Sequence, residues 1–314
     1  MIPISFRCHV ARKAQTKQAP ASHIGAHGSD AKGHSRMQTG NRTSLKELKD
    51  TATTIRKDVI RMVARHGQGY VQQGLGAADL FSYLYFQELR FDTANLNWAD
   101  RDRFILSTAH NTAVFYATLA RAGLLEPQTL AEYCLDGSSL EINASERLGP
   151  LVECTCGSLG QGLSVAAGLA MGSRRQQRDA NIYLMLGDGE LEEGQVWEAA
   201  MFAATHKLSN LTMIIDLNYM QVEGDARDVA AIDPVDAKLQ SFGWQTIIID
   251  GHDFEAMFAS FAAARADTDR PSCIIAHTTP GKGVPFLEGQ KSHNMVLPED
   301  TAGDALQWLE ADHG

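Results

Sequence analysis

The sequence lacks any apolar run long enough to cross a membrane, and it has fewer basic than acidic residues. A membrane helix needs about 18 or more consecutive apolar residues, whereas the longest apolar runs, such as 211–215 and 246–249, have the length of a strand. The 28 Lys and Arg residues against 38 Asp and Glu residues give a formal net charge of −10. This balance argues against nucleic acid or an anionic membrane surface as a partner. We expect a soluble protein with small-molecule ligands.

Cysteine and proline are also scarce. The five cysteines are odd in number and match neither a zinc-ligand pattern nor the disulfide framework of a small secreted domain. We predict reduced thiols in a cytoplasmic protein, with Cys154 and Cys156 as packing residues rather than redox groups. The nine prolines are scattered and mark no boundary, so we expect one large α/β domain over residues 43–314.

The first 42 residues differ in composition from the rest of the chain. They are rich in Lys, Arg, Ser, Gly and Ala, with Asp30 as their only acid and no hydrophobic periodicity. Such a segment is typical of disorder. Two explanations stay open for this basic leader: a transit peptide, or a gene start placed too far upstream, with Met37 as the true initiator.

Hydrophobic spacing predicts helices first and an alternation of strands and helices later. A helix is expected between Ser44 or Thr43 as N-cap and Gly67 as stop, followed by helices over 75–89, 110–125 and 163–177. Apolar strands are then expected at 181–186, 211–217, 244–250 and 272–279, with helices at 193–206, 235–243 and 254–266 between them. This order predicts a parallel sheet covered by helices on both faces.

Two of the expected strands end in residues suited to a cation. Asp188 follows one strand and Asn218 follows the next, 30 positions later, and ligands gather at the carboxyl ends of parallel strands. Carboxylate and amide oxygens suit Mg²⁺, or Ca²⁺ as an alternative. Gly187 and Gly189 would allow a phosphate group to approach the backbone closely. A lone Gly-Asp-Gly is common in turns, so the remaining motifs decide.

Five motifs occur in register and carry a resemblance. They are RDRFILSTAH (101–110), GSLGQG (157–162), GDGELEEGQVWEA (187–199), DLNYMQVEG (216–224) and PGKGVPFLEG (280–289). With these motifs the chain resembles the N-terminal, thiamine diphosphate binding domain of the transketolase family over about residues 44–294. The resemblance implies a thiamine diphosphate binding fold with thiamine diphosphate and Mg²⁺ as cofactors.

The resemblance implies roles for the residues around the diphosphate. Asp188 and the Asn218 side chain match the metal ligands, with the Met220 carbonyl as a third ligand, and Gly189, beside Gly187, matches an amide donor to the diphosphate. His110 matches the histidine beside the diphosphate, and His293 is the candidate for a second one; either could instead be a solvated or capping histidine.

Other positions match the remaining parts of the cofactor site. Gly157 and Leu159 correspond to backbone positions bordering the aminopyrimidine ring. Glu193 and Glu198 resemble glutamates that link two active sites across a subunit interface, although Glu also favours the first turn of a helix for its dipole. The roles of Gln161 and Lys282 stay open.

The chain departs from the family pattern at two substrate-side histidines. Tyr70, in GYVQQG, and Asn143, in EINASE, stand where the family has His. A tyrosine, with an ordinary pKa near 10, is a poorer acid–base group at neutral pH than a histidine near 6.5. We therefore expect Tyr70 to be the catalytic-site residue that makes the ketol donor unusual.

The resemblance also implies a partner. The family's pyrimidine-binding domain has no counterpart before Gly314, so the expected enzyme is a split transketolase in which two such chains and two pyrimidine-domain subunits form a heterotetramer. Its reaction would move a two-carbon ketol unit from a ketose or ketose phosphate to an aldose. Two alternatives stay open: a subunit of an enzyme that decarboxylates 2-oxo acids, and a non-catalytic cofactor-binding partner.

Overall fold

The computed structural model describes residues 42–67, 69–290, 292 and 296–311. The predicted leader, apart from Arg42, and the candidate His293 lie outside these residues. The described helices are α1 Leu45–His66, α2 Val71–Tyr83, α3 Thr112–Arg121, α4 Gln161–Arg175, α5 Gly194–Thr205, α6 Ala226–Val229, α7 Val235–Phe242, α8 Phe254–Ala266 and α9 Glu299–Glu310. Within the described ranges, no helix is both long and apolar enough to cross a membrane.

Five parallel strands form the central sheet, in the order β1-β2-β3-β7-β6. Their bounds are β1 Arg103–Leu106, β2 Ile182–Gly187, β3 Leu211–Leu217, β6 Gln245–Asp250 and β7 Ser272–His277, and a separate antiparallel pair consists of β4 Met220–Gln221 and β5 Gly224–Asp225. Shorter turns of helix occupy Leu84–Glu88, Pro127–Glu132, Glu146–Leu151 and Gly189–Glu192. The predicted α/β fold with a parallel sheet is confirmed.

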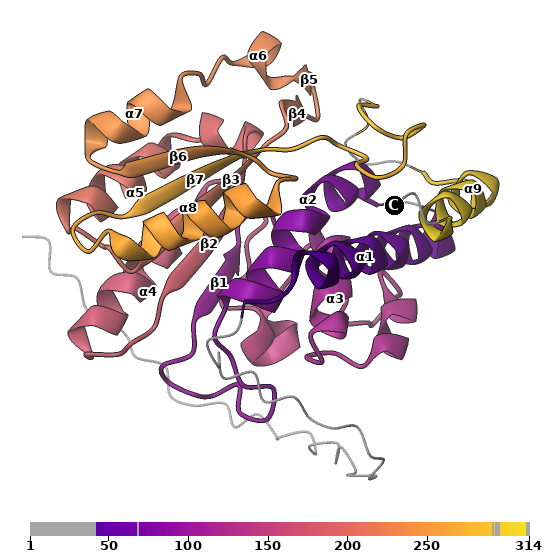
Figure 1. The fold of residues 1–314 in the computed structure, drawn as a ribbon, viewed down its shortest axis with the longest axis horizontal. Helices are drawn as coiled ribbons and strands as arrows, with labels where there is room; N and C mark the ends of the chain where they lie inside the picture. Colours follow the sequence, from indigo (N-terminus) through magenta and orange to yellow (C-terminus); the bar gives the residue numbers. More distant parts are fainter. Residues whose placement is uncertain (1–41, 68, 291, 293–295, 312–314) are drawn as a thin grey trace, which may run out of the picture. The chain divides into compact units, whose positions relative to one another are not determined.

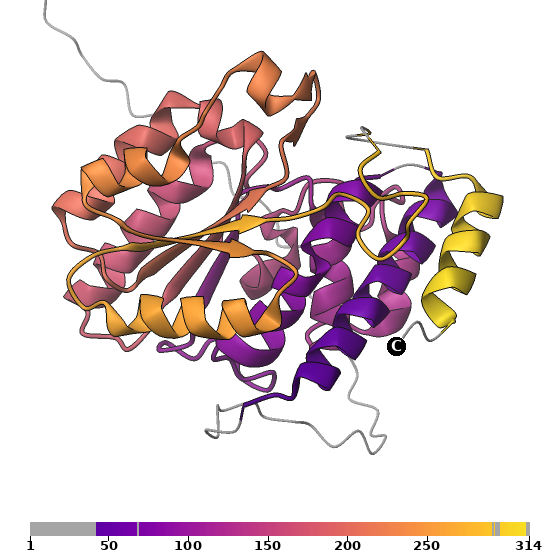
Figure 2. The same ribbon diagram turned by 45° about the horizontal axis from the view of Figure 1, so that its top comes forward.

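Each face of the sheet has its own hydrophobic core, because alternate strand residues point to opposite sides. On β2, Tyr183 and Met185 pack with residues of α1, α2, α3 and α8. Ile182, Leu184 and Leu186 pack with residues of α4, α5 and α7. Figure 2 shows α8 on one side of the strands, with α5 and α7 on the other, as labelled in Figure 1.

Helix α1 begins and ends where its sequence signals predict. The Ser44 side chain accepts a hydrogen bond from the Glu47 amide, and the Glu47 carboxylate accepts one from the Ser44 amide. This reciprocal pair satisfies two amides that the first turn leaves without helical partners. Gly67 ends the helix in the left-handed conformation, at φ 77°, which glycine adopts without steric cost.

Several elements were not predicted from the sequence. Strand β1 has only four residues, fewer than a periodicity needs to stand out, and β4 and β5 have two residues each. Helix α9 follows Pro298, which lies at its N-cap, and is rich in acidic residues. The predicted strands β2, β3, β6 and β7 and helices α5, α7 and α8 lie within two residues of their expected limits.

Sheet register brings the ends of two strands together. Gly187, the last residue of β2, pairs with Asp216 of β3, and Leu217 of β3 pairs with His277 of β7. Residues 188 and 218 therefore leave the sheet at the same edge. The following turns, which contain Gly189–Glu192 and the β4–β5 pair, are built over this edge (Figure 1).

Candidate active site

Asp188 connects the ends of β2 and β3. One oxygen of its carboxylate accepts a hydrogen bond from the Gly189 amide at 2.8 Å, and the other accepts from the Asn218 amide at 3.1 Å and from the Tyr219 amide. The Asn218 side-chain oxygen accepts from the Met220 amide at 2.9 Å. The structure thus brings together the three residues that the sequence analysis assigned to a cation.

Tyr219 makes the turn between these ligands. Its φ of 57° lies in the left-handed region, which is uncommon for residues other than glycine and asparagine. Strained backbone of this kind persists where surrounding contacts hold it, and it clusters at functional sites. Here the Tyr219 amide is held by Asp188, and the Tyr219 carbonyl accepts from the Ala226 amide at 3.0 Å.

The acids beneath the turn are buried without a basic partner. Asp188 is 2% exposed, and Asp216 and Glu190 are nearly as buried. Burial and the like charge of Asp216 raise the pKa of Asp188 to about 7, and burial raises the pKa of Asp216 and of Glu190. Within the described residues, no Lys, Arg or His nitrogen lies within 4.0 Å of these three carboxylates. A bound cation would offset this unfavourable burial.

The described part of the chain contains no group of three or more His, Cys, Asp or Glu side chains that could hold a metal ion. The predicted cation site has another composition, since it combines one carboxylate, one amide oxygen and one backbone carbonyl. Such a set of hard oxygen donors, filled out by water and phosphate oxygens, suits Mg²⁺.

Glu190 anchors the GSLGQG loop to the same edge of the sheet. Its carboxylate accepts hydrogen bonds from the Gly160 amide at 2.7 Å and from the Ser107 hydroxyl. Gly160 has φ 82°, and a Cβ added there would lie 2.8 Å from the Gln195 side chain and 2.9 Å from that of Glu193. Glycine is therefore required for the loop to pass this close to α5.

A cavity of about 310 Å³ opens over the strand ends. Of the residues predicted for the site, its lining includes His110, Leu159, Gly187, Asp188, Gly189, Glu193, Asn218 and Met220. Tyr70, Gly157 and Glu198 do not line it. In the single chain, Gly157, Glu193 and Glu198 are exposed, so the predicted link across a subunit interface remains a prediction. The two glycine amides already have acceptors, in Asp188 for Gly189 and at 3.5 Å in Glu190 for Gly187.

Tyr70 packs on the predicted cofactor-side histidine. The ring centroids of Tyr70 and His110 are 4.9 Å apart, with an angle of 50° between the ring planes, and burial raises the pKa of the Tyr70 phenol. Asn143 is exposed, and its neighbour Ala144 donates to the carbonyl of Ala109 at 3.3 Å. Both departures from the family pattern therefore lie beside the segment that carries His110.

Thr108 and Asn111 are among the polar residues of the cavity that the sequence analysis missed. The hydroxyl oxygen of Thr108 and the side-chain oxygen of Asn111 are buried, and neither finds a hydrogen-bond partner among the described residues. Both line the cavity. Buried polar atoms are nearly always partnered, so these two atoms indicate a missing ligand. Thr108 lies within the motif at 101–110 and Asn111 directly follows it, so their position on either side of Ala109 and His110 was the signal that could have found them.

The residues left open in the sequence analysis lie outside the cavity lining. Gln161 is the exposed first residue of α4. The Lys282 amine lies 4.0 Å from the Glu288 carboxylate, with 37% of the lysine side chain exposed. Neither position adds a group to the site.

A family comparison accounts for this combination of fold and site. Residues 48–309 match the model of the transketolase thiamine diphosphate binding domain. The chain belongs to the transketolase family. A putative transketolase family protein of Sinorhizobium fredii is 37% identical over 275 residues, which cover 87% of this chain and 96% of that protein.

Two further relatives have names that describe a reaction. The 6-deoxy-6-sulfo-D-fructose transketolase subunit SqwG of a Clostridium species is 35% identical, over 84% of this chain and 96% of that protein. One of the apulose-4-phosphate transketolase subunits of Actinobacillus succinogenes is 34% identical, over 85% of this chain and 97% of that protein.

Solved transketolases share the fold. The enzyme of Leishmania mexicana superposes with a TM-score of 0.79 at 28% identity, and that of Campylobacter jejuni with 0.79 at 31% identity. The match covers 84% of this chain in both cases, and 41% and 43% of those enzymes. The chain thus spans about two fifths of the length of these structures.

Proposed function

We propose that this protein is the N-terminal subunit of a thiamine diphosphate- and Mg²⁺-dependent transketolase. The observation that carries the proposal is Asp188, a buried carboxylate without a basic partner, held beside Asn218 at the wall of a 310 Å³ cavity. A family member with this arrangement is suited to hold a cation and, through it, a diphosphate.

The residues present fit the cofactor. Asp188, the Asn218 side chain and the Met220 carbonyl would hold Mg²⁺, with Ca²⁺ as an alternative. Thr108 and Asn111 would gain the hydrogen bonds that their buried side chains lack. The Gly189 amide would exchange its hydrogen bond to Asp188 for one to the diphosphate. Leu159 and Gly157 would border the aminopyrimidine ring. When bound, thiamine diphosphate supplies a carbon nucleophile for cleaving a bond next to a carbonyl.

His110 is the proposed acid–base group of this chain. It lines the cavity, and the Tyr70 ring holds its imidazole from one side. An imidazole with an ordinary pKa near 6.5 can take up and release a proton at neutral pH. Tyr70, in place of histidine, would act by positioning that ring and by hydrogen bonding rather than by proton transfer. His293, outside the described residues, remains a candidate for a second such group.

The proposed donor is a ketose that differs from the usual sugar phosphates. Two lines support it: Tyr70 and Asn143 replace the substrate-side histidines, and two relatives of matching length carry names with 6-deoxy-6-sulfo-D-fructose and apulose 4-phosphate. A loss of two histidines changes which hydroxyl groups of the donor can be bound and deprotonated. The acceptor would be an aldose.

A separate subunit is proposed to complete the site. The relatives named as subunits match this chain over nearly their whole length, while the solved transketolases are more than twice as long as the matched part. We infer a partner that carries the pyrimidine domain, in a heterotetramer of two copies of each chain. Glu193, the exposed N-cap of α5, and Glu198, exposed on α5, would then face another subunit. The cytoplasmic location remains part of the proposal.

An assay of the assembled complex tests this function. This chain would be tagged in its native cells, purified with whatever partner protein it retains, and supplied with thiamine diphosphate and Mg²⁺. Xylulose 5-phosphate and 6-deoxy-6-sulfofructose would be compared as ketol donors, with pyruvate as a 2-oxo acid donor and the separated chains as controls. We expect transfer of the two-carbon unit only when both chains are present.

The other outcomes point to the alternatives. Consumption of pyruvate with release of CO₂ would replace the proposal with a decarboxylating enzyme. Tight, Mg²⁺-dependent binding of thiamine diphosphate without turnover of any donor would indicate a non-catalytic partner. Absence of cofactor binding in the purified complex would contradict the assignment of the site itself.

A further inference from the structure

The loop that leads into α4 holds two cysteines whose sulfur atoms face each other. Cys154 and Cys156 are separated by one residue, and their Sγ atoms are 3.4 Å apart. Cys156 is buried, whereas Cys154 is partly exposed. A disulfide bond has an S–S length of about 2.05 Å, so the two atoms need to approach by about 1.4 Å. Both cysteines pack in the core as predicted, but packing alone does not require their sulfur atoms to meet.

The backbone around the pair has room to move. Thr155, between the cysteines, is exposed. Its hydroxyl oxygen lies 2.6 Å from the Glu146 carboxylate and 3.1 Å from the Glu146 amide. A Cβ added at Gly157 would meet no atom within 4 Å. A shift of Thr155 and Gly157 therefore moves exposed residues on either side of the buried Cys156.

The two thiols differ in reactivity. The two sulfur atoms share a hydrogen bond, which lowers the pKa of Cys154 although burial and the nearby Glu146 and Glu153 oppose this change. The same hydrogen bond, with burial, raises the pKa of Cys156. Burial raises the pKa of Cys134 as well. A thiolate is the reactive form of cysteine, and Cys154 is the partly exposed member of the pair whereas Cys156 is buried. Cys154 is therefore the favoured nucleophile.

We propose that Cys154 and Cys156 form a reversible disulfide at the edge of the cofactor cavity, with low-molecular-weight disulfides as the oxidant. The Cys154 thiolate attacks one sulfur of the external disulfide, whose S–S bond breaks and releases one thiolate. Cys156 then gives its proton to solvent, and its sulfur attacks that of Cys154, displacing the second external thiolate. Two protein thiols are oxidised, and one external disulfide is reduced to two thiols.

The disulfide would act on the cofactor wall, an effect that rests on the proposed function. Leu159, three residues after Cys156, lines the cavity, and its carbonyl accepts from the Gln195 side chain at 2.8 Å. The next amide, that of Gly160, bonds to Glu190. Because Gly160 is fixed closely against α5, movement at Cys156 is taken up by the residues between them. Oxidation should therefore displace Leu159 and weaken cofactor binding.

Thiol counting tests the redox pair without any cofactor. The full chain would be equilibrated with mixtures of oxidised and reduced glutathione and then unfolded in an excess of an alkylating reagent. Mass spectrometry would count the alkylated thiols. The alkylated thiols should fall from five to three of the five cysteines. Cys156→Ser should retain glutathione on Cys154, Cys154→Ser should leave Cys156 free, and the control Cys134→Ser should still lose two thiols. Five alkylated thiols at every ratio, or a bond mapped to other cysteines, would overturn the proposal.

A second measurement separates the effect on the cavity from the proposed function. Thiamine diphosphate with Mg²⁺ would be titrated into the reduced and the oxidised complex, and we expect a several-fold higher dissociation constant after oxidation, absent in both serine variants. Equal affinities in the presence of the disulfide would overturn the link to the cavity. A reduced complex that fails to bind the cofactor would count against the proposed function, while the thiol count would still decide the redox pair.

Discussion

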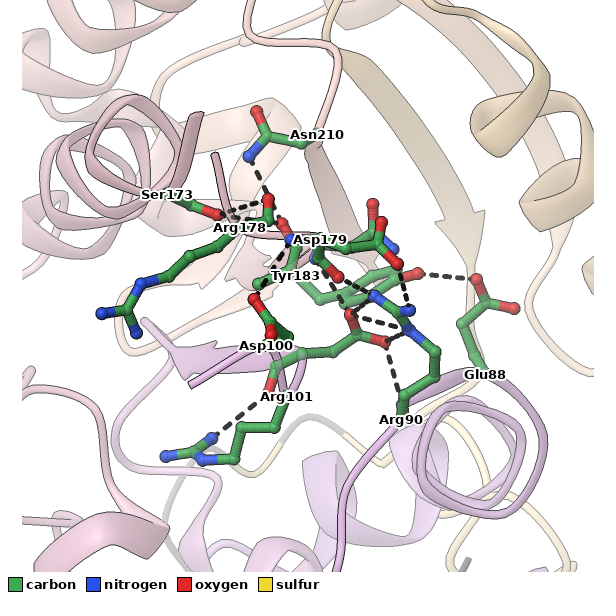
Figure 3. Close-up of polar contacts among 12 residues, drawn as sticks. Glu88, Arg90, Asp100, Arg101, Ser173, Arg178, Asp179, Tyr183 and Asn210 are labelled. Atoms are coloured by element: carbon green, nitrogen blue, oxygen red, sulfur yellow. Dashed lines mark hydrogen bonds and ion pairs between the residues drawn. The ribbon is translucent and has the colours of Figure 1, made fainter. Parts of the chain in front are cut away.

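Buried acids occur at both ends of the central sheet, but only those at one end are paired with an arginine. At the end where the strands begin, Asp102 is almost fully buried and bonds to the Arg90 guanidinium at 3.0 Å and to the Asn181 amide at 2.9 Å. Figure 3 shows Arg90 reaching toward Asp179 across this end of the sheet, with Tyr183 donating to Glu88 nearby. At the end where the strands stop, Asp188, Asp216 and Glu190 form no ion pair within 4.0 Å among the described residues, although the more distant charge of His252 lowers the pKa of Asp216.

The difference separates structural acids from acids that await a ligand. A buried carboxylate beside an arginine keeps its charge through an ion pair and hydrogen bonds, so Asp102 links β1 to β2 without further help. Three buried carboxylates without a cation are unfavourable, which is why burial and Asp216 raise the pKa of Asp188 to about 7. A fold retains such a group where another charge completes it, and we propose that a metal ion does so here.

Removal of the Asp188 carboxylate should produce the largest effect. Asp188→Ala removes a metal ligand, so Mg²⁺-dependent binding of thiamine diphosphate to the assembled complex should fall by more than about a hundredfold, since even outer-shell partners of a metal contribute about 10–100-fold. Isothermal calorimetry would measure it, with circular dichroism to verify the fold. Unchanged cofactor affinity would remove the basis for the cation site.

The matching change at the other end should affect stability instead. Asp102→Ala leaves the amides of Arg90 and Asn181 without their acceptor and leaves the Arg90 guanidinium with Asp179 alone. Breaking a buried ion pair costs about 3–5 kcal/mol of unfolding free energy. Urea denaturation would measure the loss, and Asp50→Ala, which removes an exposed i, i+4 pair with Lys46, should cost less than about 0.5 kcal/mol. If Asp102→Ala altered cofactor affinity but not stability, Asp102 would not be a structural acid, and the proposed difference between the two ends of the sheet would be contradicted.

The charge state of Asp188 should be visible in the pH dependence of the metal-free chain. Its pKa is about 7 when folded, against 3.8 as the reference value, so between these pH values the folded state holds a proton that the unfolded state has lost. Stability should therefore fall as pH rises from about 4 to 7, by at most about 1.4 kcal/mol per pH unit from this group.

Comparison with Asp188→Asn isolates that contribution. The variant cannot ionise at this position, so its unfolding free energy, from urea titrations at pH 5 and pH 7, should decline less than that of the wild-type chain. Identical slopes for the two proteins would show that Asp188 ionises normally despite its burial. Added Mg²⁺ should stabilise the wild-type chain more at pH 7 than at pH 5, because the metal binds the deprotonated carboxylate.

The sequence allowed the scaffold and the proximity of Asp188 to Asn218 to be predicted, because both depend on local patterns. Long apolar strands and amphipathic helices have a clear period, and in a parallel sheet Asp188 and Asn218 leave neighbouring strands at the same edge. Short elements such as β1 and the β4–β5 pair were not predicted, since a strand of four or two residues is too short to show a hydrophobic periodicity. Strand β1 forms by pairing with β2, which is distant in sequence, whereas β4 and β5 pair only with each other.

Contacts between segments distant in sequence could not be predicted. Nothing near Glu190 indicates that it anchors Gly160, 30 residues upstream, and nothing near Tyr70 indicates that it stacks on His110. The missing partners of Thr108 and Asn111 are also a tertiary property, because they depend on which atoms fail to approach. Such details require coordinates, even where the motif is recognised.

Thr108 offers the smallest and most specific test of the comparison. Thr108→Val replaces a buried hydroxyl that has no partner by a methyl group of similar size, so stability should stay within about 1 kcal/mol of the wild-type value. If that hydroxyl bonds to the cofactor, affinity should fall by about 1 kcal/mol, roughly fivefold.

Thr118→Val is the matched control for this change. Thr118 is equally buried, but its hydroxyl donates to the Val114 carbonyl at 2.7 Å, so its loss should lower stability by about 1 kcal/mol and leave cofactor affinity unchanged. Thr108→Val should thus lower cofactor affinity and Thr118→Val should lower stability, since the first hydroxyl would bond to the ligand and the second bonds within the fold. Equal stability losses with no change in affinity would mean that Thr108 has a partner inside the protein, and that only the acids distinguish this end of the sheet.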